Sequence, residues 1–263
     1  MRKETIQDKL VIRPSSLSTF LNCPYKWYLH HIEKIPTIPN AIMVTGTAVH
    51  KGAEVGYTEK IQTKKLPPVD VLTDAAVEEF KEKIKEAKTD EEDISKYEKA
   101  VVEDTKLYHS SVMKQVEPVA VEKRYVVKLD NPFIEEIGGT ADIVLKNGIG
   151  DIKLTLRKAV ADRYKLQLST YAILAERVEG KPFNYAEIHN IVNEKSAYII
   201  PVSLALKQTK FIINNLIDSV TAVLSGQVLP EIAFRGNPTS FLCDKKYCDF
   251  YDRCPFVKGK NFP

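Results

Sequence analysis

The hydrophobic pattern changes its period in the middle of the chain, and this change limits the folds open to it. Residues 119–129 alternate apolar and polar side chains and are rich in Val and Tyr, which is typical of a β-strand. Residues 137–145 and 149–156 continue the strand pattern, and Asn147-Gly148 between them is a hairpin turn signal. These segments predict three strands, of which the last two form a hairpin.

Segments with helical spacing of apolar residues lie on both sides of these strands. Ahead of them, the spacing predicts helices over 14–34 (broken at Cys23-Pro24, because proline disrupts a helix), over 41–60 and, as a pair, over 74–117. After them it predicts a helix over 162–178, strands over 184–193 and 196–202, and a helix over 203–226. Hairpins combined with a crossover helix indicate an α/β fold whose mixed central sheet is flanked by helices.

Charge and hydropathy narrow the class of protein. The net charge of +3 permits a nucleic-acid partner without requiring one. The sequence begins without an apolar leader segment, and no run approaches the roughly 18 to 20 apolar residues that span a bilayer. We therefore expect a cytoplasmic protein with no membrane partner. In that reduced compartment the four cysteines are better explained by metal ligation than by structural disulfides.

A carboxylate–lysine group sits on the predicted hairpin. Asp151 and Lys153 are two residues apart on one strand and so share a face, and the hairpin returns the chain so that Asp142 approaches Asp151. Two close carboxylates repel unless a cation lies between them, and Mg²⁺ or Mn²⁺ takes such oxygen ligands, to which the Ile152 carbonyl could add another. On spacing alone, a pair of surface aspartates at strand ends is the commoner explanation.

Two further motifs favour a site. Gln167 and Tyr171 in QLSTY are four residues apart on the predicted helix after this strand, so they share one helical face. His50 ends GTAVH on an earlier helix. A lone histidine is usually structural, but histidine is also a common metal ligand and proton carrier.

Taken in order, GTAVH, GGTADIV, GDIKLT and QLSTY resemble the motifs of RecB-like nucleases in the PD-(D/E)XK superfamily, over residues 15 to 257. The resemblance implies a restriction-endonuclease-like fold with one nuclease domain over 1–263, and we expect a helical insertion over 51–117. It implies metal-dependent hydrolysis of DNA phosphodiester bonds.

The same resemblance implies a role for each matching residue. His50, Asp142 and Asp151 would be metal ligands, Lys153 the catalytic lysine, and Gln167 and Tyr171 would position DNA beside the site. Glu122 matches a frequent acidic position on the first strand, with a surface residue as the alternative. The usual Asp-aromatic-Lys-Thr here reads Asp-Ile-Lys-Leu-Thr, which leaves any role for Thr155 in doubt.

The cysteines are spaced unevenly, as one early residue and three late ones: Cys23, Cys243, Cys248 and Cys254. Four thiolates suit either Zn²⁺ or a [4Fe–4S] cluster, but structural zinc sites usually pair close cysteines. The layout, with Cys-Pro at both ends, resembles the iron–sulfur staple of AddB-type and CRISPR-adaptation exonucleases. The first gap of the trio is longer than usual, so zinc or ordinary buried thiols stay open. A staple from Cys23 to the Cys-rich tail 230–263 would close a loop of more than 200 residues, worth roughly 4 to 5 kcal/mol.

Basic and aromatic side chains offer weaker signals for DNA. Arg157, Lys158 and Arg163 could line a phosphate track beside the site, or simply belong to a solvated loop. The aromatic residues of 25–28, beside Cys23, could stack on unpaired bases, although packing around the metal centre explains them better. No base-reading motif is present.

These observations predict an exonuclease acting on single-stranded or end-bearing DNA in recombination, repair, phage replication or CRISPR adaptation. The sequence has no G-x-x-x-x-G-K-[ST] phosphate loop, so any unwinding would need a helicase or another recombination or CRISPR partner protein. A non-catalytic DNA-binding or assembly subunit on the same scaffold is the alternative. A zinc-stapled structural protein is a third hypothesis.

Overall fold

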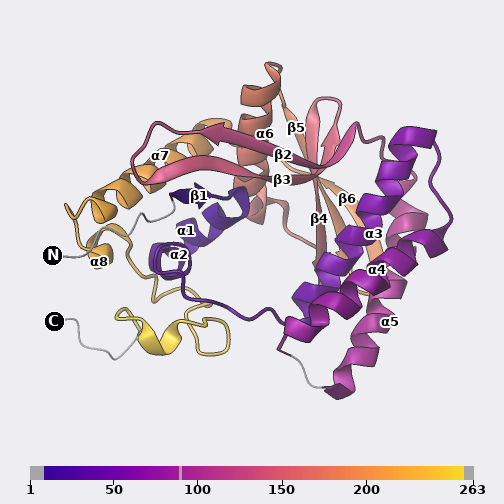
Figure 1. Cartoon of the computed structure of the whole chain (residues 1–263), viewed down its shortest axis with the longest axis horizontal. Helices are drawn as coiled ribbons and strands as arrows, with labels where there is room; N and C mark the ends of the chain where they lie inside the picture. Colours follow the sequence, from indigo (N-terminus) through magenta and orange to yellow (C-terminus); the bar gives the residue numbers. More distant parts are fainter. Residues whose placement is uncertain (1–8, 89–90, 258–263) are drawn as a thin grey trace. The chain divides into compact units, whose positions relative to one another are not determined.

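The computed structural model describes residues 9–88 and 91–257 (Figure 1). These residues form two compact units. One unit contains residues 9–37, 126–139 and 205–257, and the other contains the described residues of 38–125 and 140–204. Every predicted active-site residue belongs to the second unit, and all four cysteines belong to the first.

The strands of the second unit form a mixed sheet. Its members are β2 (Ala120–Lys128), β3 (Ile134–Leu145), β4 (Gly148–Thr155), β5 (Tyr185–Val192) and β6 (Ser196–Pro201), of which β2 and β3 continue into the other unit. The β3–β4 and β5–β6 pairs are antiparallel, whereas β4 and β5 are parallel along the whole of β4. The helix α6 (Lys165–Glu179) makes the crossover between β4 and β5. The predicted α/β fold with a mixed central sheet is confirmed.

The hairpin that positions the site differs from its prediction by one residue. Leu145 pairs with Gly148, so Lys146 and Asn147 form the turn and Gly148 begins β4. A Cβ atom added to Gly148 would lie 2.9 Å from the carbonyl oxygen of Tyr185 on β5. The glycine is therefore required by the close approach of the neighbouring strand rather than by the turn conformation.

Three helices cover one face of this sheet. The helices are α3 (Ala41–Thr63), α4 (Val69–Lys83) and α5 (Glu91–Tyr108), and Figure 1 shows them grouped beside β4 and β6. Their apolar side chains form one buried cluster with Ile143, Ile152 and Ile191 of the sheet. Because side chains alternate along a strand, Asp151 and Lys153 face the opposite side, where α6 packs against β4 and β5. The long α3 begins at Asn40, whose side chain caps it by accepting a bond from the Met43 amide.

The first unit differs from prediction mainly at element ends. The predicted 14–34 helix is broken at Cys23, as expected, into η1 (Pro14–Ser16), α1 (Leu17–Asn22) and α2 (Pro24–His31). The strand β1 (Leu10–Ile12), parallel to β3, was not predicted, because three residues show no periodicity. The remaining helices are α7 (Leu206–Leu224), α8 (Pro230–Ala233) and the 3-10 turn η5 (Tyr251–Arg253).

Aromatic side chains fill the centre of the first unit. The ring of Trp27 is fully buried and stacks on Phe234 at 5.8 Å between centroids, and Tyr25 and Tyr28 are buried too. These rings pack inside the protein, so the alternative in which they stack on DNA bases is wrong. Within the described residues, no helix has the length and apolar character needed to cross a membrane.

Candidate active site

Asp142 is placed where two strands separate. The β3–β4 ladder ends at the pair Ile143–Gly150, and the Ile152 amide N–H then donates to Asp142 Oδ2 at 2.8 Å. This bond satisfies a backbone donor that the ladder no longer pairs. It also fixes the Asp142 carboxylate beside β4.

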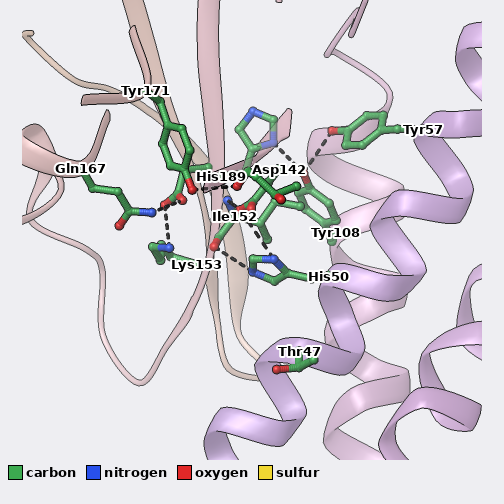
Figure 2. Close-up of polar contacts among 12 residues, drawn as sticks. Thr47, His50, Tyr57, Tyr108, Asp142, Ile152, Lys153, Gln167, Tyr171 and His189 are labelled. Atoms are coloured by element: carbon green, nitrogen blue, oxygen red, sulfur yellow. Dashed lines mark hydrogen bonds and ion pairs between the residues drawn. The ribbon is translucent and has the colours of Figure 1, made fainter. Parts of the chain in front are cut away.

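Three metal-ligand side chains converge at this point. His50 of α3, Glu122 of β2 and Asp142 of β3 each offer one ligand atom, and these atoms lie within 4.8 Å of one another. The Nε2–H of His50 donates to the Ile152 carbonyl at 2.9 Å, so in the neutral ring Nδ1 is an acceptor, 3.5 Å from Asp142 Oδ2 (Figure 2). Acceptors that face one another repel unless a cation lies between them, so this nitrogen and oxygen set fits Mg²⁺ or Mn²⁺.

Glu122 has a backbone conformation that is rare for its residue type. Its φ of +44° lies in the left-handed region, which disfavours residues with a Cβ. Although Glu122 is exposed, partial desolvation in the cleft, followed by the negative charges of Asp142 and Glu54, raises its pKa to about 7, and Lys51 acts in the opposite direction. The sequence left Glu122 as an uncertain candidate, because an acidic residue on an alternating strand is usually a solvated one.

Asp151 and Lys153 form a pair beside the three ligands. Asp151 is buried, with Lys153 Nζ 2.8 Å from Oδ2 and the Gln167 amide donating to Oδ1 at 2.8 Å. Burial raises the pKa of Asp151 to about 6; Lys153 opposes this shift and Asp142 adds to it. Burial lowers the pKa of Lys153, but the carboxylates of Asp151 and Asp142 outweigh it and the net shift is upward. The lysine is therefore held as an ammonium.

The structure brings most of the predicted site residues together and leaves the basic ones apart. His50 contacts Asp142, and Asp151 contacts Lys153 and Gln167; the Ile152 backbone, bonded to both His50 and Asp142, joins these two sets (Figure 2). Tyr171 stands beside them and donates to the Thr140 carbonyl at 2.7 Å. Asp151 is outside the tight group of three ligand atoms, and the Ile152 carbonyl is engaged by His50. The basic residues Arg157, Lys158 and Arg163 are exposed after β4.

The converging groups open to solvent through a cleft of about 650 Å³ between α3 and β4. His50, Glu122, Asp142 and Lys153 all line it, together with the carboxylates of Glu54 and Glu79. The cleft therefore gives an ion or a small molecule access from solvent to the three candidate ligand residues.

Comparison with known proteins identifies the family of the chain. The model of the PD-(D/E)XK nuclease superfamily matches residues 12–255. The chain belongs to this superfamily. The chain has the same fold as a solved structure from Eubacterium rectale that is provisionally described as an exonuclease. The two align with a TM-score of 0.60 and 12% sequence identity, over 87% of this chain and 88% of the other. The structure of SSO0001 aligns with a TM-score of 0.41 and 14% identity, over 98% and 91% of the two chains. No curated protein matches.

The four cysteines of this PD-(D/E)XK chain share one pocket. Cys23, Cys243, Cys248 and Cys254 are free thiols that line a cavity of about 270 Å³ in the first unit. Burial and then the other three cysteines raise the pKa of the Cys254 thiol. The fold therefore brings residues more than 200 positions apart in sequence to one place.

A buried polar chain behind the site was not found from the sequence. His189 on β5 is fully buried; its Nε2 lies 2.7 Å from Glu187 and its Nδ1 lies 2.5 Å from Tyr108 Oη. Tyr108 in turn contacts Tyr57 Oη at 3.1 Å (Figure 2). Tyr57 is on α3, the helix that carries His50, and His189 is in register with Ile152 of β4. These buried polar contacts thus connect α3 to the sheet next to His50, Glu122 and Asp142.

Replacing His189 with Ala should lower the free energy of unfolding by about 3 to 5 kcal/mol, because the Glu187 carboxylate loses its buried partner. Tyr57→Phe removes only the last bond of the chain and should cost about 1 kcal/mol. Chemical denaturation of both variants measures the two effects. A loss below 1 kcal/mol for His189→Ala would contradict the structural role.

Proposed function

We propose that this PD-(D/E)XK protein is a divalent-metal-dependent deoxyribonuclease that hydrolyses phosphodiester bonds as an exonuclease on single-stranded or end-bearing DNA. The observation that carries the proposal is the convergence of His50, Glu122 and Asp142 beside an ammonium, Lys153, in an open cleft. The provisional description of the Eubacterium rectale structure as an exonuclease supports the choice of exonuclease over endonuclease.

His50, Glu122 and Asp142 would hold Mg²⁺ or Mn²⁺, with Asp151 as a further ligand once it releases Lys153. Such an ion lowers the pKa of water and stabilises the charge that develops on a phosphate. Lys153, which is held as an ammonium beside Asp151, would neutralise the scissile phosphate. Gln167 orients Asp151 through its amide, and Tyr171 holds α6 against β3.

For the cysteine pocket we propose a [4Fe–4S] cluster. Sulfur atoms around one zinc ion lie about 3.8 Å apart. Among the side chains that the structure describes (residues 9–88 and 94–257), no three thiol sulfurs lie within 4.8 Å of one another. Four thiols that line one cavity but do not gather to the spacing of a zinc site suit the larger [4Fe–4S] cluster better than a single ion.

The proposal is tested by incubating the purified protein with 5′- and 3′-labelled single- and double-stranded DNA in Mn²⁺, Mg²⁺ and EDTA. We expect metal-dependent release of short products from single-stranded substrates or from ends, and no products with Asp151→Asn. DNA binding without cleavage in either metal would instead favour the non-catalytic subunit. If duplex DNA stays intact while single strands are cut, adding a helicase tests whether unwinding by a partner protein is required.

The affinity for Mn²⁺ should rise as the pH increases from 6 to 8. Glu122 has a pKa of about 7, so its carboxyl group is mostly protonated at pH 6 and mostly ionised at pH 8, and only the ionised form competes well for a cation. Glu122→Gln should flatten this rise and leave a smaller dependence below pH 6 from Asp151. Calorimetric titration with Mn²⁺ at four pH values measures this pH dependence. An equally steep rise of affinity in Glu122→Gln would contradict the proposal that Glu122 is a metal ligand.

A further inference from the structure

One row of side chains extends from Lys153 across the sheet to an exposed tyrosine. Lys153 of β4 is in register with Asn190 of β5, and Asn190 is in register with Tyr198 of β6. Residues directly paired across strands have their side chains on the same face. Tyr198 therefore lies on the face that carries Lys153, about 10 Å away, since two strand spacings separate them. Tyr198 is 40% exposed.

A basic loop reaches over this tyrosine. The loop 156–160 follows β4, and the ammonium of Lys158 lies 4.9 Å from the centroid of the Tyr198 ring. Arg157 and Leu156, next to it, are exposed, and Leu156 is 64% exposed. The surface beside Lys153 thus combines two positive charges, an aromatic ring and an apolar side chain. Phosphates, unpaired bases and sugars recognise this combination.

The loop is fixed in place from inside the protein. The fully buried Asn190 accepts a bond from the Ala159 amide at 2.7 Å and donates to Thr155 Oγ1 at 2.7 Å. Thr155 Oγ1 donates in turn to the Arg157 carbonyl at 2.7 Å. Asn190 and Thr155 therefore hold the loop at both of its ends, so the two basic side chains start from a fixed backbone. This gives Thr155 a role in shaping the loop rather than in the chemistry.

We propose that Tyr198 and Lys158 form a nucleotide subsite for single-stranded DNA, next to the phosphate that is cut. The ring of Tyr198 stacks on an unpaired base, and Lys158 pairs with the adjoining phosphate. A base that is still paired in a duplex cannot present its face to the ring, so the subsite selects single strands. The inference deepens the proposed nuclease function and rests on it for the identity of the neighbouring phosphate.

The test measures binding separately from cleavage. Fluorescence anisotropy of the full chain with labelled single-stranded and duplex oligonucleotides is recorded in Ca²⁺, and gels verify that the DNA stays intact. Tyr198→Ala should weaken single-strand binding about 5- to 140-fold and duplex binding less than twofold, since stacking of one base on an aromatic ring contributes an affinity in that range. Tyr198→Phe should bind like the wild type. Lys158→Ala should lower the slope of log affinity against log salt by roughly 0.7 for single strands.

The matched control is Phe211→Ala, which removes another exposed aromatic side chain from the other compact unit. It should leave both affinities unchanged. Single-strand affinity within twofold of wild type in Tyr198→Ala overturns the subsite, as does an equal loss for single strands and duplex. If the wild type cuts no DNA but its binding still depends on Tyr198, the nuclease proposal fails and the subsite stands. If the wild type cleaves DNA but Tyr198→Ala binds single strands as well as the wild type, the nuclease proposal stands and the subsite fails.

Discussion

Asp142→Asn should reduce DNA cleavage by on the order of 10³-fold or more and abolish tight Mn²⁺ binding, while leaving the protein folded. The amide oxygen of Asn can still accept the Ile152 N–H, so the junction of β3 and β4 keeps its bond. Only the negative charge is lost. That charge is central to the site, because His50 Nδ1 and Glu122 offer their ligand atoms to the same point.

Initial cleavage rates and calorimetric Mn²⁺ titration of Asp142→Asn measure the two losses independently. Glu79→Gln is the matched control: it removes a carboxylate from the same cleft but not from the ligand group, and should change the rate less than tenfold. Equal losses in both variants would mean that the general negative charge of the cleft matters, and the assignment of the ligands would be wrong.

The second large effect concerns the cysteine pocket. If the pocket holds the proposed [4Fe–4S] cluster, the wild type is brown and contains iron, and substituting any one of Cys23, Cys243, Cys248 or Cys254 with Ala should remove both. It should lower the free energy of unfolding by roughly 4 to 5 kcal/mol, because the closure of a loop of more than 200 residues is lost. Iron and zinc analysis, visible absorption and denaturation under exclusion of oxygen measure these changes.

Ser18→Ala is the control for the pocket. Ser18 lines the same cavity but offers no thiolate, so colour, iron content and stability should stay as in the wild type. Colourless wild-type protein that contains one zinc ion per chain would replace the cluster with a zinc site. Protein that contains neither metal, with unchanged stability in the cysteine variants, would leave four ordinary thiols.

Local sequence patterns were sufficient to predict most of the fold. The alternation in β2 and β4, the helical spacing in α3 and the break at Cys23 all depend on near neighbours in sequence. The predictions were wrong where contacts between residues distant in sequence determine the structure. The strand β1 is only three residues long and forms because it pairs with β3. Gly148 is required by the close approach of Tyr185 and not by the turn. Helix α6 begins at Lys165 rather than 162, because Ala161–Arg163 form a separate 3-10 turn.

The candidate site was predictable only in part, for a similar reason. Spacing on one hairpin placed Asp142, Asp151 and Lys153 near one another, and the order of the family motifs pointed to His50. Neither kind of signal could show that Glu122 of β2 joins the ligand atoms more closely than Asp151 does. His189 gave no signal either, since its partners Tyr108 and Glu187 are polar residues that only the folded chain brings together.

The left-handed backbone conformation of Glu122 makes the folded protein less stable at the point where the proposed chemistry takes place. A residue with a Cβ at φ +44° costs roughly 1 to 2 kcal/mol more than glycine would at the same place. A second cost is the crowding of its carboxylate against two others, visible in the raised pKa of Glu122. A cation bound between Glu122, His50 and Asp142, as proposed, would relieve the repulsion but not the backbone strain, so the apo protein should gain stability when this residue is replaced by glycine even though metal binding is lost.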